Sequence, residues 1–245
     1  GKTTLVEALL HQAGAIGAPG SVERGTTVSD FDPLALRAQH SLHSTLVHLQ
    51  HQDTRIHLID TPGAPDFLGQ SLPALEAVET AAIVINAANG IEPMALRMME
   101  YAAERHLDRL IVVNKIDEGI GNIDQLVAEI QEIFGAECLP LNLPTEGGAA
   151  VEDCYFNDSG QPTVVSSVEE AHQQVIDQVV EVDESLMEDY LESGKEPSPG
   201  KLHDAFEKAL REGHLIPICF TSAETGVGIT KLLEIFSQLA PNPLE

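Results

Sequence analysis

The sequence contains no tryptophan, three cysteines and few basic residues. The cysteines, Cys138, Cys154 and Cys219, are odd in number and show no C-x-x-C spacing, which favours reduced thiols in an intracellular protein. Because 13 Lys and Arg face 39 Asp and Glu, the net charge is −26, which argues against non-specific nucleic-acid binding through a broad basic face. No apolar run approaches the roughly 20 residues that a membrane-spanning helix needs.

What is present is a chain of 245 residues, 43% of them hydrophobic, enough for one sizeable core with a smaller subdomain attached. The chain begins with Gly1 inside a motif and ends in a proline-containing stretch, residues 241–245, which we interpret as a linker to a following domain. We therefore expect a fragment shortened at both ends.

The stretch Arg55 to Phe67, RIHLIDTPGAPDF, carries the first candidate site. The run from Ile56 to Ile59 has the pattern of a short buried strand, and Asp60 stands at its carboxyl end, the edge where ligands bind open α/β sheets. We interpret Asp60 as a group near Mg²⁺, and Gly63 as a backbone N–H that can approach a terminal phosphate without a Cβ in the way. Taken alone, these residues are also those of an ordinary Pro-Gly turn.

The first four residues, Gly1-Lys2-Thr3-Thr4, form the back half of the pattern G-x-x-x-x-G-K-[ST]. In that pattern Lys2 reaches the β- and γ-phosphates and Thr3 holds Mg²⁺. Residues 4–13 follow with the apolar periodicity of a helix, whose N-terminus supplies an anion site. The strand that should lead into Gly1 would be central to the sheet, so the fragment alone is expected to expose two strand edges, bind nucleotide weakly and aggregate.

Polar residues also follow two later apolar runs. After residues 110–113, Asp117 can accept hydrogen bonds from guanine N1–H and N2–H₂, Asn114 can brace the loop, and the Lys115 stem can lie along the base. By itself this is a polar strand end. Asp117 nevertheless disfavours a kinase or another ATPase, since adenine does not present those two donors.

Ser222-Ala223 follows the apolar run of residues 215–220. A turn of small residues there can direct backbone N–H groups at guanine O6. The order of the four stretches and their shared position at strand ends together predict a guanine-nucleotide site.

With these motifs, the chain closely resembles a known family, the GTPase domain of elongation factor G. Within that family it is most similar to the elongation factor G-like paralogues. The resemblance covers nearly the whole chain. It rests on GKTTLVEALL, GSVERGTTVSDFD, DTPGAPDF, GIEPMALRMMEYA, NKID, ESLMEDYLE and SQLAPNP. It implies a cytoplasmic translation factor that binds GTP or GDP with Mg²⁺ and hydrolyses GTP during translocation or ribosome release. The implied partners are ribosomal RNA and the stalk protein, with no DNA, membrane or stable oligomer.

The resemblance also implies the site. Lys2 and Gly63 are the expected catalytic residues. The expected nucleotide-binding residues are Gly1, Lys2, Thr3, Thr4, Asp60, Gly63, Asn114, Lys115, Asp117, Ser222 and Ala223. The expected Mg²⁺ ligands are Thr3, Ser41 and, through a water, Asp60.

The chain departs from the family twice within this site. By resemblance, residues 15–41 correspond to the family's first switch segment, in which Ser41 replaces a metal-binding Thr. Ala38-Gln39 replaces the family's Arg-Gly pair, which puts the usual closure of the switch segment in question. The family's water-orienting His after Asp-Thr-Pro-Gly is Ala64 here. Ala64 cannot position water, so a GTP-binding switch that hydrolyses slowly is the competing hypothesis.

The predicted fold class is α/β: a P-loop NTPase with a doubly wound, mostly parallel sheet whose first strand is missing, and an inserted α+β subdomain. The expected core spans residues 1–136 and 214–240, the insertion 137–213 and the linker 241–245. Core strands are predicted at 42–49, 55–60, 81–87, 109–114 and 215–220, and core helices at 4–13, 66–80, 92–106, 123–134 and 228–239. In the insertion, strands are predicted at 138–143 and 151–156 and helices at 168–180, 185–191 and 202–211.

Two further patterns have a plain and a functional interpretation. The acidic helices of the insertion are a solvated face, or by resemblance a docking surface for the ribosomal stalk protein. Five histidines fall between residues 40 and 57, and we interpret them as solvent-facing positions rather than a metal-binding hairpin. They are His40, His43, His48, His51 and His57.

Overall fold

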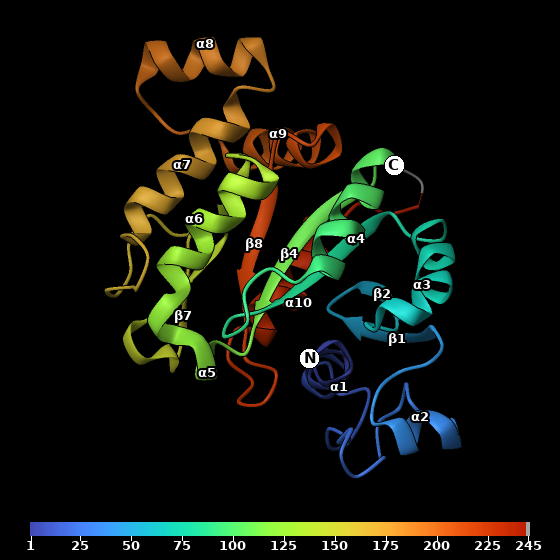
Figure 1. The fold of residues 1–245 in the computed structure, drawn as a ribbon. Coiled ribbons are helices and arrows are strands. Elements are labelled where there is room, and N and C mark those ends of the chain that lie inside the picture. Colours follow the sequence, from blue (N-terminus) through green and yellow to red (C-terminus); the bar gives the residue numbers. More distant parts are fainter. Residues whose placement is uncertain (244–245) are drawn as a thin grey trace.

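The computed structural model describes residues 1–243, and its centre is a four-stranded parallel sheet (Figure 1). The strand order is β3-β4-β8-β5, and every neighbouring pair is parallel. The four strands are β3 (Thr80–Asn86), β4 (Asp108–Asn114), β8 (Ile216–Phe220) and β5 (Cys138–Pro140). Because β3, β4 and β8 are parallel neighbours, Asn86, Asn114 and the Ser222-Ala223 turn lie at the same edge of this sheet.

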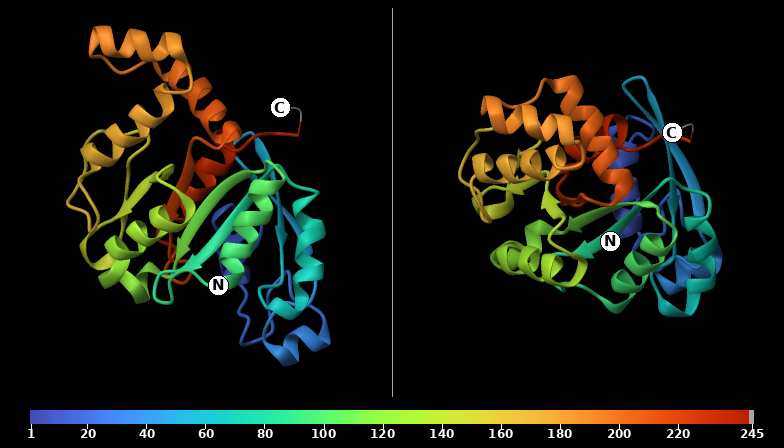
Figure 2. Two further views of the ribbon diagram at one scale, coloured as in Figure 1. Left: turned by 45° about the horizontal axis from the view of Figure 1, so that its top comes forward. Right: turned by 90° about the horizontal axis from the view of Figure 1, so that it is seen from above.

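Successive residues of β4 point into two different cores, because side chains alternate across a strand. Leu110 and Val112 belong to one buried cluster, and Ile111 and Val113 belong to the other. Helices cover both faces of the sheet (Figure 2, right). One face is covered by α1 (Lys2–Gln12), α7 (Val168–Val180), α9 (Pro199–Glu212) and α10 (Ile229–Gln238), and the other by α4 (Pro93–Glu104) and α6 (Ile123–Phe134). This confirms the doubly wound P-loop NTPase fold.

A separate hairpin of β1 (Thr45–His51) and β2 (Thr54–Asp60) stands beside the main sheet. Within residues 1–243, β2 pairs only with β1 and β3 pairs only with β4. A cavity of about 410 Å³ separates β2 from β3. Its apolar lining includes Leu5, Leu58, Val84 and Phe236, from α1, β2, β3 and α10. The sheet is therefore interrupted near its centre, in agreement with the predicted missing strand.

The insertion is more closely joined to the core than the sequence suggests. The strand predicted at 138–143 is two strands, because β5 joins the main sheet while β6 (Asn142–Pro144) pairs antiparallel with β7 (Val151–Asp153). From α7 and α9, Val175 and Phe206 share the buried cluster of Leu110. The expected boundary at residue 137 thus falls inside the main layers, whereas α8 (Glu184–Ser193) projects from them (Figure 1).

The switch segment and the turn after β2 differ from prediction in detail. The helix predicted at 66–80 is a short turn, η1 (Pro65–Phe67), followed by α3 (Leu68–Leu75), which contains Pro73. A helix that periodicity does not show, α2 (Pro33–Ala38), forms inside the switch segment. Its signal is local: Asp32 accepts from the N–H of Leu34, and proline occupies the first helical position.

Candidate functional site

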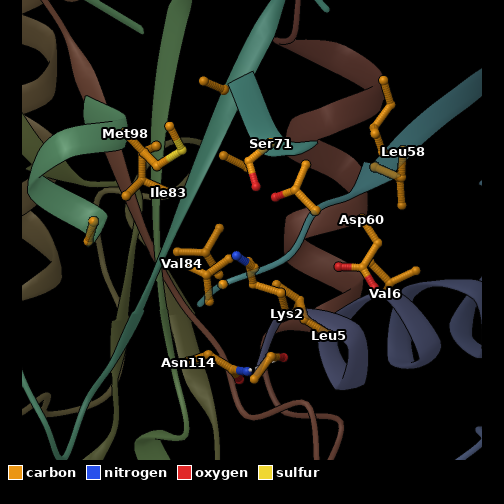
Figure 3. A pocket seen from close by; sticks show the side chains of 18 of the residues that line it. Lys2, Leu5, Val6, Leu58, Asp60, Ser71, Ile83, Val84, Met98 and Asn114 are labelled. Carbon is orange, nitrogen blue, oxygen red and sulfur yellow. Dashed lines mark hydrogen bonds between the residues drawn. The ribbon is translucent and has the colours of Figure 1, made fainter. Parts of the chain in front are cut away.

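Lys2 brings the start of the chain against the turn after β2. Its Nζ donates to the carbonyl oxygen of Pro62 at 3.1 Å, and a Cβ built on Gly63 would lie 3.3 Å from the same Nζ. Figure 3 shows Lys2 extending from α1 towards the space beside Val84. Burial lowers the pKa of Lys2, and the nearby Asp60 and Glu92 carboxylates oppose that shift. The two predicted phosphate-binding segments therefore meet at Lys2 and Gly63.

Thr3, Ser41 and Asp60 form a buried oxygen cluster next to Lys2. Thr3 Oγ1 donates to Asp60 Oδ2 at 2.8 Å and lies 3.2 Å from Ser41 Oγ. Asp60 is 4% exposed, and its second oxygen, Oδ1, has no hydrogen-bond partner among residues 1–243. Burial raises the pKa of Asp60, while the hydrogen bonds from Thr3 and Ser29 lower it. A set of hydroxyl and carboxylate oxygens with one unpartnered carboxylate oxygen fits Mg²⁺, which prefers oxygen ligands.

Sequence reasoning missed two members of this cluster, Ser29 and Asp30. Ser29 Oγ donates to Asp60 Oδ2 at 2.9 Å, and Ser41 Oγ donates to Asp30 Oδ2 at 2.9 Å. Both residues are buried although they lie in a loop. No local motif marks them, since their partners lie 31 and 11 residues away. The one available signal was a Ser-Asp pair just before the helix start at Asp32.

Glu7 was also missed, and it fastens the switch segment to α1. Its side chain is 1% exposed and accepts from the backbone N–H groups of Gly20 at 2.7 Å and Val28 at 2.5 Å. A buried carboxylate is stable only when such donors satisfy it. The path of the switch segment therefore depends on one side chain of the first helix. Thr4, also expected at the site, lies half-buried in the first turn of α1.

At the other end of the site, Asn114 joins three segments. Its Oδ1 accepts from the N–H of Ala223 at 2.9 Å and from Thr221 Oγ1 at 3.3 Å. Its Nδ2 donates to the carbonyl oxygen of Gly1 at 3.4 Å. Asn114 is 2% exposed; its bond with Thr221 is buried, and those with Ala223 and Gly1 are partly buried. Asn114 thus joins the end of β4 to the Ser222-Ala223 turn and to Gly1, while its role at a nucleotide site stays a prediction.

Lys115 and Asp117 follow Asn114 in the loop after β4. Lys115 adopts a left-handed conformation with φ 66°, and its Nζ pairs with Glu118 at 3.1 Å. Asp117 is exposed in the short helix α5 (Ile116–Gly119), which leads into η2 (Ile120–Asn122). A carboxylate in that position is free to accept hydrogen bonds from a ligand.

The Ser222-Ala223 turn is present, but its N–H groups are engaged. The N–H of Ser222 donates to the carbonyl oxygen of Val227 at 2.9 Å, and that of Ala223 donates to Asn114. Ser222 Oγ accepts from the N–H of Thr225 at 3.2 Å. For either N–H to reach guanine O6, its present bond would have to be exchanged or shared. The role of this turn in base recognition stays a prediction.

Ala64 is the half-buried residue that precedes η1, and it directly follows Gly63. Its side chain is a methyl group. The exposed Pro65 occupies the first position of η1. The position at which the family carries a polar side chain therefore contributes no hydrogen-bonding side-chain atom.

Three structural elements bring the candidate residues together: the N-terminus of α1 with Lys2 and Thr3, the end of β2 with Asp60, and the end of β4 with Asn114. This arrangement defines a nucleoside-triphosphate-binding domain of the P-loop class. Residues 1–242 match the family described as the elongation factor Tu GTP binding domain, and the chain belongs to that family.

Several curated proteins and a solved structure are similar over this chain. An elongation factor G-like protein of Mycobacterium tuberculosis is 34% identical over 100% of the chain. Elongation factor G 2 of Vibrio parahaemolyticus is 30% identical over 100% of it, and peptide chain release factor 3 of Streptococcus sanguinis is 31% identical over 99%. A crystal structure of a Thermus thermophilus protein superposes with a TM-score of 0.89 at 32% identity, over 99% of this chain and 39% of that one.

The chain spans only part of these relatives, covering 36%, 38% and 48% of the lengths of the three curated proteins. No helix within residues 1–243 has both the length and the apolar character needed to cross a membrane.

Proposed function

We propose that this chain is the GTP- and Mg²⁺-binding domain of a translation factor that hydrolyses GTP on the ribosome. The observation that carries the proposal is the side-chain network that joins Gly1, Asn114 and Ala223 at one end and Thr3 with Asp60 at the other. Family membership supports GTP binding and hydrolysis in general. The names of the relatives, elongation factor G-like protein, elongation factor G 2 and release factor 3, support the ribosome as the place of action.

In this proposal the residues have distinct roles. Lys2 and Gly63 bind the terminal phosphates, and the N–H groups at the start of α1, after Gly1, complete the anion site. Thr3 and Ser41 would hold Mg²⁺, with Asp60 contributing through a water. The metal would neutralise charge on the β- and γ-phosphate oxygens.

The base would be bound by the loops at the ends of β4 and β8. Asp117 accepts from guanine N1–H and N2–H₂, while Asn114 holds the loop and the stem of Lys115 lies along the base. Ser222 and Ala223 form the turn facing guanine O6. We assign Thr4 only to the first turn of the phosphate-binding helix.

We further propose that the activity is coupled to translocation or ribosome release, in the cytoplasm. The projecting helix α8 would dock the ribosomal stalk protein. Its support is an exposed Leu191, 70% accessible, and Met187, 37% accessible, on a helix otherwise rich in carboxylates. An isolated apolar surface on an acidic helix suits a protein partner better than nucleic acid.

Ala64 favours a second candidate, a GTP-binding switch that hydrolyses slowly. A group that orients the attacking water commonly contributes about 10²–10⁴-fold to the rate. Without it, nucleotide affinity, which depends on other residues, would remain while turnover fell.

The test uses the full-length protein that contains this chain. Equilibrium binding of a fluorescent GTP analogue, with Mg²⁺ and with EDTA, should show tight Mg²⁺-dependent binding that excess GTP displaces and excess ATP does not. GTP turnover with and without ribosomes then separates the two candidates: acceleration by ribosomes supports the translational GTPase, and tight binding with no turnover supports the switch. Equal displacement by ATP would contradict both.

A further inference from the structure

The phosphate end of the site has a polar side chain that the role assignments above leave unused, His40. It immediately precedes Ser41, whose hydroxyl lies 3.2 Å from Thr3 Oγ1 in the oxygen cluster. His40 is therefore anchored by its neighbour at the metal end of the site, although its own side chain is exposed to solvent. The residue before it, Gln39, ends α2 in a left-handed conformation with φ 54°, and so turns the chain out of the helix just before His40.

The imidazole of His40 lies against the turn that contains Ala64. Its ring centroid is 5.8 Å from that of Phe67, with the planes tilted by 46°. The N–H of Phe67 donates to the carbonyl oxygen of Ala64 at 3.0 Å, so the Phe67 ring and Ala64 belong to one hydrogen-bonded turn. A tilted aromatic pair at this separation is a favourable contact. The structure thus brings an imidazole from the switch segment to the turn in which residue 64 provides none.

The hydrogen bonding of His40 determines which ring nitrogen is available. Nδ1 lies 3.3 Å from the backbone carbonyl oxygen of Ser41, and because a carbonyl oxygen only accepts, Nδ1 must carry the proton of this bond. In the neutral ring Nε2 is then an acceptor. Nε2 makes no hydrogen bond within residues 1–243, so it can accept one from a water molecule.

We infer that His40, from the switch segment, positions the attacking water in this protein in place of a side chain at residue 64. The inference rests on the proposed GTPase function. His40 directly precedes Ser41, whose hydroxyl pairs with Thr3, and its ring contacts Phe67 in the turn that contains Ala64. That turn directly follows Gly63, which lies against Lys2. The acceptor Nε2 orients the water, while Phe67 and the Ser41 carbonyl oxygen hold the ring.

The experiment is single-turnover GTP hydrolysis by the full-length protein with saturating ribosomes, beside equilibrium binding of a fluorescent GTP analogue. His40→Ala should slow hydrolysis by about 10²-fold, within the range for a group that orients a reacting water. GTP affinity should change by less than about twofold, because the imidazole acts on the attacking water rather than on nucleotide binding. His40→Gln should retain part of the rate, since a glutamine amide can also orient water.

Two further variants separate a chemical from a structural role. His43→Ala removes an exposed imidazole three residues further along the chain, just after the switch segment, and should leave the rate unchanged. In the His40→Ala background, adding Ala64→His with Pro65→Val supplies an imidazole from the turn after β2 and should restore most of the lost rate. Rescue from another position is not expected if His40 only shapes the switch segment.

The outcomes are distinct. Hydrolysis by His40→Ala at the wild-type rate overturns the inference. A wild-type protein that binds GTP tightly but does not hydrolyse it on ribosomes also overturns the inference, but that result would support the second candidate function, the GTP-binding switch. Failure of the wild-type protein to bind GTP would instead overturn the proposed function itself.

Discussion

The side-chain oxygen of Asn114 accepts a hydrogen bond of 2.9 Å from the backbone N–H of Ala223, 109 residues further along the chain. The same side chain donates to the carbonyl oxygen of Gly1 at 3.4 Å. One buried amide therefore couples the start of the chain, proposed to bind phosphate, to both loops proposed to bind the base.

Replacing Asn114 by Ala should weaken both the fold and nucleotide binding. The change leaves the partly buried N–H of Ala223 and the buried hydroxyl of Thr221 without their acceptor, and a buried unsatisfied group costs about 1–3 kcal/mol. Chemical denaturation of the nucleotide-free protein and titration with fluorescent GDP measure the two effects. Asn122→Ala, at an exposed position in η2, is the matched control and should change neither. Full stability in Asn114→Ala would contradict the coupling.

Asp117→Asn should change the preference of the site from GTP to xanthosine triphosphate. Xanthine has a carbonyl where guanine has an amino group, so an amide N–H₂ suits it and a carboxylate does not. Each mismatch, asparagine against guanine or aspartate against xanthine, should cost about 1–3 kcal/mol of binding free energy. Competition titrations with both nucleotides test this, with Glu118→Gln, the exposed neighbour, as control. A variant that still prefers GTP would show that Asp117 does not read the base.

Asp60→Asn should stabilise the nucleotide-free protein near neutral pH and weaken Mg²⁺-dependent nucleotide binding. Burial raises the pKa of Asp60 in the folded state, so over the interval between its unfolded and folded pKa the folded protein binds more protons than the unfolded one. The stability contributed by Asp60 is therefore full below its unfolded pKa and lost as pH rises through its folded pKa. The gain in melting temperature from Asp60→Asn should thus appear at pH values above the folded-state pKa of Asp60. It should shrink at pH values below the unfolded-state pKa.

Melting curves across pH, without nucleotide, provide the measurement. Asp66→Asn, an exposed carboxylate on η1, should show no such pH-dependent gain. Adding Mg²⁺ and GDP should reverse the order, since the wild-type carboxylate then gains a cation. A lower melting temperature for Asp60→Asn at every pH would contradict the assignment of burial as the dominant effect.

Glu7→Ala should release the switch segment. Two backbone N–H groups lose a charged acceptor, and hydrogen bonds to charged groups contribute about 1.5–3 kcal/mol each. Limited trypsin digestion should then cut at the exposed Arg24 at least about ten times faster than in the wild type. Glu104→Ala, an exposed carboxylate at the end of α4, should digest at the wild-type rate. Unchanged cleavage at Arg24 would show that other contacts hold the segment.

Residues 1–245 expressed alone should bind an apolar dye and associate. The facing edges of β2 and β3 lack a strand partner within the described part of the chain, and the 410 Å³ cavity between them is largely apolar. Dye fluorescence and light scattering across protein concentrations measure this. A monomeric chain that binds no dye and binds GTP tightly would contradict it.

Much of this architecture could be predicted from local pattern. The apolar run of β4 predicts a strand buried on both faces, and the 3.6-residue period of α6 and α7 predicts helices buried on one face. Both patterns are properties of consecutive residues, so they can be read from the sequence. The stretches around Asn114 and Ser222, proposed to bind the base, were also recognisable, because each follows an apolar strand and neighbouring parallel strands bring their carboxyl ends to one edge.

What the sequence by itself determined was therefore the class of fold and the residues at its strand ends. The tertiary structure alone decided the contacts of Ser29 and Asp30 with the Asp60 cluster, the attachment of the switch segment to Glu7, the division of residues 138–144 between two sheets, and the position of His40 beside Phe67. The physical reason is that backbone periodicity records which face of an element is buried. Pairing between side chains dozens of residues apart depends instead on how the finished layers pack, and no local pattern carries that information.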